Sequence, residues 1–236
     1  MWYTTTYQQV SLTSLKVSTA TSTGGKSLLL PTPFALKMAL LDVIIKTKGL
    51  SEGQALWPAI RGGQVAISGP ERIAVSNTFT KILKPMKGKP TLDAETGLTR
   101  GMIKTIGFRE YVFWQGNCSF AFAPAGHESE EWLQWLSTIN YIGKRGGFIQ
   151  ALGAGAETEG LSGGYVSLCE SMAQFSLNGT MQVMDDCSSE VSFEQIDIYS
   201  GKNMKVSKDR LLRHIVLPYR IQRASRGYTL YERIEA

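Results

Sequence analysis

The densest group of residues that could do chemistry is basic and lies at positions 81–104, KILKPMKGKPTLDAETGLTRGMIK. Six cations stand there against two acids, with two prolines and three glycines between them. Loops this long inside a compact domain usually have a function, and closely spaced cations can contact successive phosphates of a nucleic acid. The segment therefore predicts a basic projection along a phosphate backbone, and the alternative is a surface loop with solvated charges. The candidate contacts are Lys81, Lys84, Lys87, Lys89, Arg100 and Lys104.

Aromatic residues follow at strand spacing in IGFREYVFWQ (106–115) and CSFAFA (118–123). The alternation and the intervening Gly116-Asn117 predict a hairpin of two strands. Six aromatic rings cannot share one face of it, so some are expected on the open side of a sheet that carries helices on its other side. Rings in that position can stack nucleobases, although at least half are expected in the core. The candidates here are Arg109, Tyr111 and Trp114.

The formal net charge of +5 is distributed unevenly along the chain. Residues 1–126 carry 14 Lys and Arg against 6 acids, residues 127–200 carry 2 against 11, and residues 201–236 carry 9 against 3, which gives +8, −9 and +6. Charged faces in water would explain these blocks. The sharper interpretation is that the two basic segments converge on a polyanion while the acidic middle faces protein or water. The C-terminal candidates are then Arg220, Arg223 and Arg226.

Other motifs with possible chemistry are incomplete. GGKS at residues 24–27 invites comparison with a phosphate-binding loop, but Ala20 stands where its first glycine belongs, and five residues separate it from the next helix. Three cysteines without a CxxC pair predict reduced thiols and no zinc site. The first residues show no basic leader before an apolar block. We expect a cytoplasmic protein with no membrane partner, no metal or other cofactor and no small-molecule substrate.

The element that must hold these residues in place is a helix expected over residues 31–49. Thr32 is a suitable N-cap, Pro33 stands where a missing N–H costs nothing, and Gly49 follows the last periodic residue. An apolar stripe, widened by Leu40 and Ile44, predicts that the helix covers a sheet. The stripe consists of Phe34, Met38, Leu41 and Ile45. The lysines of this helix, Lys37, Lys46 and Lys48, are expected to be solvated.

The other elements of the first half follow in a recognisable order. We expect a long or bent strand over 2–18, then a short helical piece that stops near Pro58, and then strands over 64–68 and 72–83. A second helix is expected over 128–139, with an apolar stripe from Trp132 to Ile139. A glycine-basic turn at 143–147, with Lys144 and Arg145, then leads into a strand. Strand, helix, strand, strand, helix, strand is the α+β, ferredoxin-like order, which RNA-recognition folds share.

The second half reads as a β-rich extension. A linker is expected over 151–164, and strands are expected over 165–177 and 181–184, around Asn178-Gly179. A β-like run over 213–223 and a last strand over 228–234 follow. The predicted domains are therefore a core over residues 1–155, with an insertion over 81–105, and an extension over 156–236.

Three stretches together resemble a known family. They are LPTPFALKMALLDVII, the basic insertion before FREYVFWQGNCSFAF, and INYIGKRGGFIQ. Over residues 15–150 this pattern is similar to the Cas-five family, the RAMP-type subunits of class one, type I CRISPR effector complexes of the Cascade kind. The resemblance implies an RRM-like core with a thumb at 81–104, which sits at the five-prime handle of the crRNA. It also implies contacts with a RAMP backbone subunit and the large subunit, and places Lys144 and Arg145 near the RNA.

The same resemblance leaves two alternatives. Some members of that family cleave precursor RNA without metal by means of tyrosine, lysine and histidine, and acid-base cleavage needs a group that titrates near neutrality. This chain has only His127, expected at the surface, and His214, which has Tyr219 and Lys208 nearby in sequence. We expect a noncatalytic subunit, with a metal-independent endoribonuclease as the first alternative. The second is a RAMP-fold protein that mainly bridges protein partners.

Overall fold

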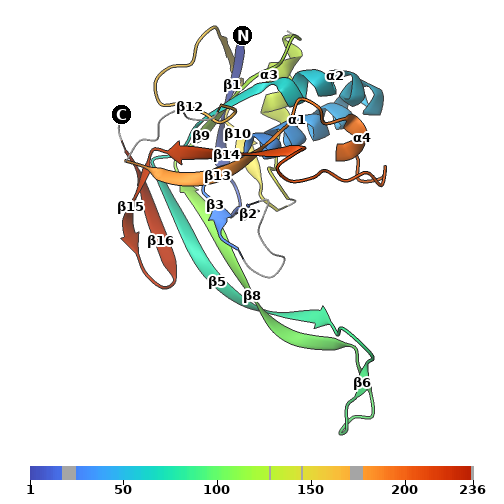
Figure 1. Ribbon diagram of the computed structural model, residues 1–236. Coiled ribbons are helices and arrows are strands. Elements are labelled where there is room, and N and C mark those ends of the chain that lie inside the picture. Colours follow the sequence, from blue (N-terminus) through green and yellow to red (C-terminus); the bar gives the residue numbers. More distant parts are fainter. Residues whose placement is uncertain (18–24, 128, 145, 171–177, 235–236) are drawn as a thin grey trace.

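The computed structural model describes residues 1–17, 25–127, 129–144, 146–170 and 178–234, and it is a mixed α+β structure rich in strands (Figure 1). Its first sheet has the strand order β10-β1-β9-β4-β12, and all neighbours are antiparallel. β1 and β4 are consequently parallel, with β9 between them. The strands are β1 (Trp2–Gln9), β4 (Gln64–Ser68), β9 (Cys118–Ala123), β10 (Ile149–Ala151) and β12 (Val166–Ser167), and β11 (Ala156–Thr158) pairs with β1.

Helices cover one side of this sheet. They are α1 (Pro33–Lys48), α2 (Leu50–Gly62) and α3 (Glu131–Thr138). The short α4 (Phe193–Ile196) lies beside α1 and α2 instead (Figure 1). The side chain of Tyr7 donates a hydrogen bond to the carbonyl of Leu136 in α3, and the rings of Phe122 and Trp132 lie 5.4 Å apart. Both Phe120 and Phe122 therefore face the helices, because residues two apart on a strand share one side.

α1 begins and ends as predicted. The hydroxyl of Thr32 accepts a hydrogen bond of 3.1 Å from the N–H of Ala35, and Gly49 has a φ of 96°, which favours glycine. The buried face of α1 differs from the predicted stripe. Phe34, Met38 and Ile45 are only half-buried, whereas Leu36, Ala39 and Val43, which lie outside the stripe, are buried together with Leu40, Leu41 and Ile44. The reason is that α2, α3 and a C-terminal strand all contact this helix.

α2 corrects the expectation of a short piece that stops near Pro58. The helix runs to Gly62 with Pro58 inside it. Trp57 and Ile60 are buried on either side of the proline, and the indole N–H of Trp57 donates to the carbonyl of Val191 at 2.8 Å. Burying two such side chains is worth about 3–6 kcal/mol, which offsets the roughly 3 kcal/mol cost of an internal proline.

The second sheet has the order β15-β16-β5-β8. Its strands are β5 (Arg72–Pro85), β8 (Met102–Gln115), β15 (Tyr219–Ala224) and β16 (Tyr228–Arg233). β5 and β8 pair continuously from Arg72 opposite Gln115 to Pro85 opposite Met102, and β6 (Thr91–Leu92) with β7 (Thr99–Arg100) extends the pair. Figure 1 shows this hairpin, which joins β4 to β9, projecting far from the body of the molecule.

The predicted hairpin of residues 106–115 with 118–123 is therefore wrong. β8 pairs with β5, whereas β9 pairs with β1 and β4. Gly116, with a φ of 105°, carries the chain from the second sheet into the first. The segment over 81–104 is likewise not a loop throughout, because its two ends continue β5 and β8. The segment is the outer part of a longer hairpin that starts at Arg72 and ends at Gln115.

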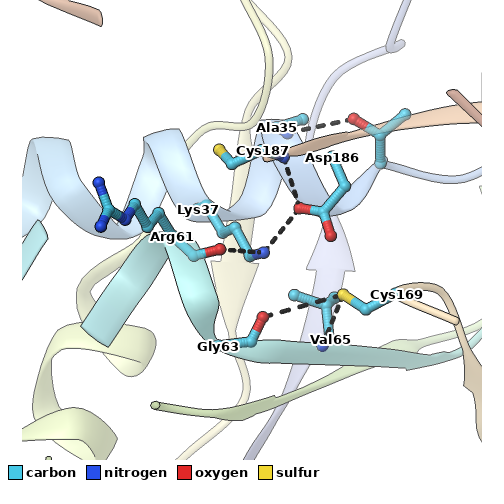
Figure 2. A network of polar contacts seen from close by, with 9 residues as sticks. Ala35, Lys37, Arg61, Gly63, Val65, Cys169, Asp186 and Cys187 are labelled. Atoms are coloured by element: carbon cyan, nitrogen blue, oxygen red, sulfur yellow. Dashed lines mark hydrogen bonds and ion pairs between the residues drawn. The ribbon is translucent and has the colours of Figure 1, made fainter. Parts of the chain in front are cut away.

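The third strand pair, β13 (Thr180–Cys187) with β14 (Arg210–Leu217), packs on α1 through a buried ion pair. The ammonium of Lys37 lies 2.6 Å from a carboxylate oxygen of Asp186 and donates to the carbonyl of Arg61 at 2.8 Å (Figure 2). Lys37 is 1% exposed, so its expected solvation is wrong. Lys46 and Lys48 are exposed as expected and form surface ion pairs.

Several predicted boundaries also change. The first strand ends at Gln9, and β2 (Leu15–Lys16) pairs separately with β3 (Ser27–Leu28). The predicted linker over 151–164 contains the strand β11, and the predicted helix over 128–139 begins at Glu131. The predicted strand over 213–223 is interrupted at Pro218, which lies between β14 and β15. Residues 171–177 of the strand expected over 165–177, and Glu128 of the expected helix, lie outside the described residues. Within the described residues, β13 pairs with β14.

Candidate nucleic-acid interface

The pairing register of the second sheet shows on which of its two faces each side chain lies. The core face carries Ile73 and Val75 of β5 opposite Trp114 and Val112 of β8, and all four are buried. We call the other side the outer face. By register, it carries Arg72, Ala74, Ser76, Thr78 and Lys84 of β5, Arg109, Tyr111, Phe113 and Gln115 of β8, Tyr228, Leu230 and Glu232 of β16, and Arg220 and Arg223 of β15.

The candidate cations of the hairpin lie on both faces and at its far end. Lys81 and Lys104 are on the continuation of the core face, while Lys84 is on the outer face. Lys87 and Lys89 follow the end of β5, and Arg100 is in β7. Apart from the half-buried Lys84, these lysines are exposed. The hairpin thus offers cations along its length, as a basic projection requires.

The aromatic candidates separate between the two faces. Trp114 is 3% exposed on the core face, where its indole N–H donates to the carbonyl of Leu29 at 2.9 Å. Its predicted place on an open sheet face is wrong, because it lies opposite the buried Ile73. Tyr111 is half-buried on the outer face, and its neighbour Phe113 is 48% exposed there. Aromatic rings do reach an open face, but on the second sheet instead of the first.

A second group of cations lies at the edge of β8. Partial burial and the nearby charges of Arg109 and Lys144 lower the pKa of Lys16. We call these three residues, which come from distant parts of the sequence, the basic junction. Sequence analysis selected Arg109 and Lys144 but missed Lys16, because a lone lysine in a threonine-rich strand carries no signal beyond its charge. Arg145 lies outside the described residues.

The glycine turn is fixed against the N-terminal segment, and this contact positions the basic junction. Gly143 has a φ of 76°, and a Cβ added there would lie 2.1 Å from a methyl carbon of Leu15. The N–H of Phe148 donates to the hydroxyl of Ser11 at 2.7 Å. Further along, Thr13 and Val112 of β8 exchange backbone hydrogen bonds of 3.0 and 2.8 Å. Glycine is required at 143 both by the backbone conformation and by the close approach.

The C-terminal candidates lie beside the base of the hairpin because β16 pairs with β5. Arg220 is 69% exposed at its side chain and lies 3.4 Å from Glu232, which also lies 3.5 Å from Arg72. Arg223 is exposed on β15, and Arg226 lies in the turn before β16. The backbone carbonyl of Arg226 accepts a hydrogen bond from the side chain of Asn77 in the middle of β5. The two basic segments of the sequence are therefore adjacent in space.

The residues proposed for other chemistry differ in their exposure to solvent. The hydroxyl of Tyr219 is buried and donates to the carbonyl of Pro70 at 2.6 Å, while His214 is exposed on β14. The ring of His127 packs edge-on against Trp132. Among the described residues, no group of three or more His, Cys, Asp or Glu side chains could hold a metal ion. The same residues include no helix long and apolar enough to span a membrane.

Comparison with known proteins gives the family context. No family model matches the chain. The curated "CRISPR-associated protein Cas5" of Archaeoglobus fulgidus is 24% identical over 206 residues, which covers 86% of each chain. The chain is a homologue of Cas5. This confirms the resemblance seen in the sequence. A solved structure, "Crystal structure of a CRISPR protein from Archaeoglobus fulgidus", aligns with 99% of this chain and 92% of that one at 14% identity and a TM-score of 0.46.

Proposed function

We propose that this Cas5 homologue is a noncatalytic subunit of a class one, type I CRISPR effector complex and binds the five-prime handle of the crRNA. The observation that carries the proposal is the gathering of cations around one hairpin. The hairpin itself, the basic junction and the β15–β16 turn supply these cations from segments far apart in the sequence. Phosphate contacts supply much of the affinity of proteins for nucleic acid, so such a surface suits a single RNA strand.

The finer fold assignment supports this proposal. The strands β10-β1-β9-β4 are the fourth, first, third and second of the core in chain order, and β1 and β4 are parallel on either side of β9. This order supports the assignment of a split βαβ arrangement, as in ferredoxin-like and RRM-like RAMP cores. The β5–β8 hairpin, inserted between β4 and β9, is then the thumb, and the residues after β10 form the β-rich extension.

The partners we propose are crRNA, a RAMP backbone subunit and the large subunit. The core face of the hairpin is buried only near the body of the molecule. Further out on the same face, apolar side chains are exposed: Phe79 is 65% exposed, Leu83 59% and Ile106 64%. Phe79 and Phe108 lie directly opposite each other, with ring centroids 5.2 Å apart. An apolar strip of this kind on a projecting hairpin is typical of a protein-docking surface, so this face suits a neighbouring subunit.

Replacement of four hairpin lysines by alanine tests the RNA part of the proposal. The variant Lys81→Ala/Lys84→Ala/Lys87→Ala/Lys89→Ala should bind a labelled handle RNA more weakly when assembled with its partner subunits. Each lost phosphate contact should reduce the slope of log K against log salt by about 0.7 for a single strand, or roughly 3 for all four. Titrations at several salt concentrations measure both quantities.

A matched control removes four exposed lysines outside the hairpin, Lys46, Lys48, Lys202 and Lys208. It changes the net charge equally, so it should lower the affinity only slightly and leave the slope within about one unit of the wild-type value. An unchanged affinity and slope in the hairpin variant would contradict the assignment of the hairpin as an RNA-binding thumb. Equal losses in both variants would show that only overall charge matters.

The noncatalytic part of the proposal is supported by the burial of the Tyr219 hydroxyl, while His214 is exposed. A metal-independent ribonuclease needs a titrating group next to an attacking hydroxyl, and Tyr219 already donates its hydroxyl within the core. Incubation of the assembled protein with precursor repeat RNA in EDTA should leave the RNA intact. Specific cleavage that disappears in His214→Ala would instead support the endoribonuclease alternative.

A further inference from the structure

We propose that the outer face of the second sheet binds unpaired bases of the RNA, with Phe113 and Tyr228 as its stacking residues. This inference rests on the proposed function and adds a location and a mode of binding to it. In the first sheet, Phe120 and Phe122 of β9 face the helices. On the other side of β9, Ala121 is fully buried and Ser119 is half-buried, so β9 exposes no ring there. The surface for base stacking is therefore built by the inserted hairpin and the C-terminal strands.

Two rows of side chains cross the outer face. In one row, Ala74 of β5 lies between Phe113 of β8 and Leu230 of β16. In the next row, Ser76 lies between Tyr111 and Tyr228. Small side chains on the middle strand thus lie between larger ones on both neighbours. A flat base over the small residue would have a ring beside it in each row, Phe113 in the first and Tyr111 or Tyr228 in the second.

The spacing of these rows favours a single strand over a double helix. Residues two apart on a strand are separated by about 7 Å, so Tyr111 and Phe113 lie roughly twice as far apart as successive bases of a duplex, whose rise is about 3.4 Å. Bases that contact successive rows must therefore be unstacked from each other. Splayed, unpaired bases on aromatic rings are the usual mode of sequence-tolerant recognition of single-stranded RNA.

Charge identifies the occupant as a polyanion. By register, the outer face carries five cations, Arg72, Lys84, Arg109, Arg220 and Arg223, and among its described residues a single acid, Glu232. Arg72 and Arg220 lie in the row on one side of the two aromatic rows, and Arg109 lies in the row on the other side, with Lys84 further along the hairpin. Arg223 lies beside Leu230, and Lys16 and Lys144 add charge at the edge of β8. Charged residues are depleted from the centre of protein–protein interfaces, so this arrangement suits an RNA backbone that enters at one end and leaves at the other.

Conservative substitutions test the stacking role without unfolding the sheet. Phe113→Leu and Tyr228→Leu keep an apolar side chain on exposed strand positions but remove the aromatic face. Each should weaken binding of labelled handle RNA to the assembled protein by about 5- to 150-fold, the range for loss of one stacked base. The salt slope should stay at its wild-type value, because no phosphate contact is removed. Phe113→Trp, which keeps an aromatic face, should bind the RNA as tightly as the wild-type protein or more tightly.

The outcomes separate this inference from the proposed function. Normal affinity in both leucine variants, together with a reduced salt slope in the hairpin-lysine variant, would overturn the stacking surface and leave RNA binding by the hairpin intact. Normal affinity and slope in all variants would overturn both. Leucine variants that bind RNA normally but lose a subunit during purification would show that the outer face docks a protein, which also overturns the inference.

Discussion

Replacement of Lys37 by methionine should be among the most destabilising single changes in this protein. Methionine has nearly the length of lysine, so the change removes charge and hydrogen bonds with little loss of packing. Lys37 is 1% exposed and the side chain of Asp186 is 4% exposed, so water cannot reach the carboxylate that remains. The carbonyl of Arg61 also loses its donor. Breaking a buried pair from one side costs about 3–5 kcal/mol.

That cost should be visible in both chemical and thermal unfolding. For a chain of this size, each kcal/mol corresponds to about 2–4 °C, which predicts a fall in Tm of roughly 6–20 °C. Urea unfolding followed by tryptophan fluorescence gives the change in free energy directly. The matched control is Lys46→Met on the same helix, whose side chain is 58% exposed in an ion pair with Asp42. It should change stability by less than about 0.5 kcal/mol.

A double variant checks the reason for the effect. In Lys37→Met/Asp186→Asn the buried charge is gone, while the amide oxygen can still accept from the N–H of Cys187, which lies 2.8 Å from the carboxylate. The double variant should therefore recover at least about 2 kcal/mol relative to Lys37→Met. A double variant as unstable as the single one, or a single variant within 1 kcal/mol of wild type, would refute the argument that an isolated buried carboxylate causes the loss.

Three further outcomes follow from local geometry. Gly143→Ala should destabilise the protein by about 1–3 kcal/mol more than Gly146→Ala, as measured by thermal unfolding. Both glycines have a positive φ, but only a Cβ at position 143 would collide with a leucine side chain. Thr32→Ala should cost about 1 kcal/mol by removing the N-cap of α1, measured by urea unfolding against Thr32→Ser. Burial raises the pKa of Cys169 and Cys187 to about 12, and that of Cys118 as well, so all three thiols stay protonated at pH 8. Alkylation should then label them only at the rate of unfolding, and rapid labelling of the folded protein would disprove this burial.

Local sequence signals were sufficient where the deciding contacts are local. The N-cap of α1 and its terminal glycine are read from residues next to each other, and both appear as predicted. The apolar stripe of α3 from Trp132 to Ile139 is also buried as expected. Element order was enough to anticipate a mixed α+β structure, which the chain has. It did not show which strands pair with which.

Distant contacts could not be read in the same way. Gly116-Asn117 between two alternating segments has the local form of a hairpin turn, yet the long pairing of β8 with β5 decides the outcome. Lys37 looked like a solvated residue because its partner Asp186 is 149 positions away. At the candidate site, sequence alone placed Tyr111 and Trp114 together, since it could not show which face of β8 is covered.

The position of β16 has a consequence for synthesis of the chain. This strand lies between β15 and β5, so the second sheet is incomplete until residues 228–233 have been made. They follow β5 by roughly 150 residues, which corresponds to roughly 8–30 s at ordinary elongation rates. During that interval the nascent hairpin has an unpaired β5 edge, and the rows that contain Tyr228 and Leu230 do not yet exist. The RNA binding that we propose for this face can therefore begin only after the C-terminal strands have docked, which would separate the time of translation from the time of assembly.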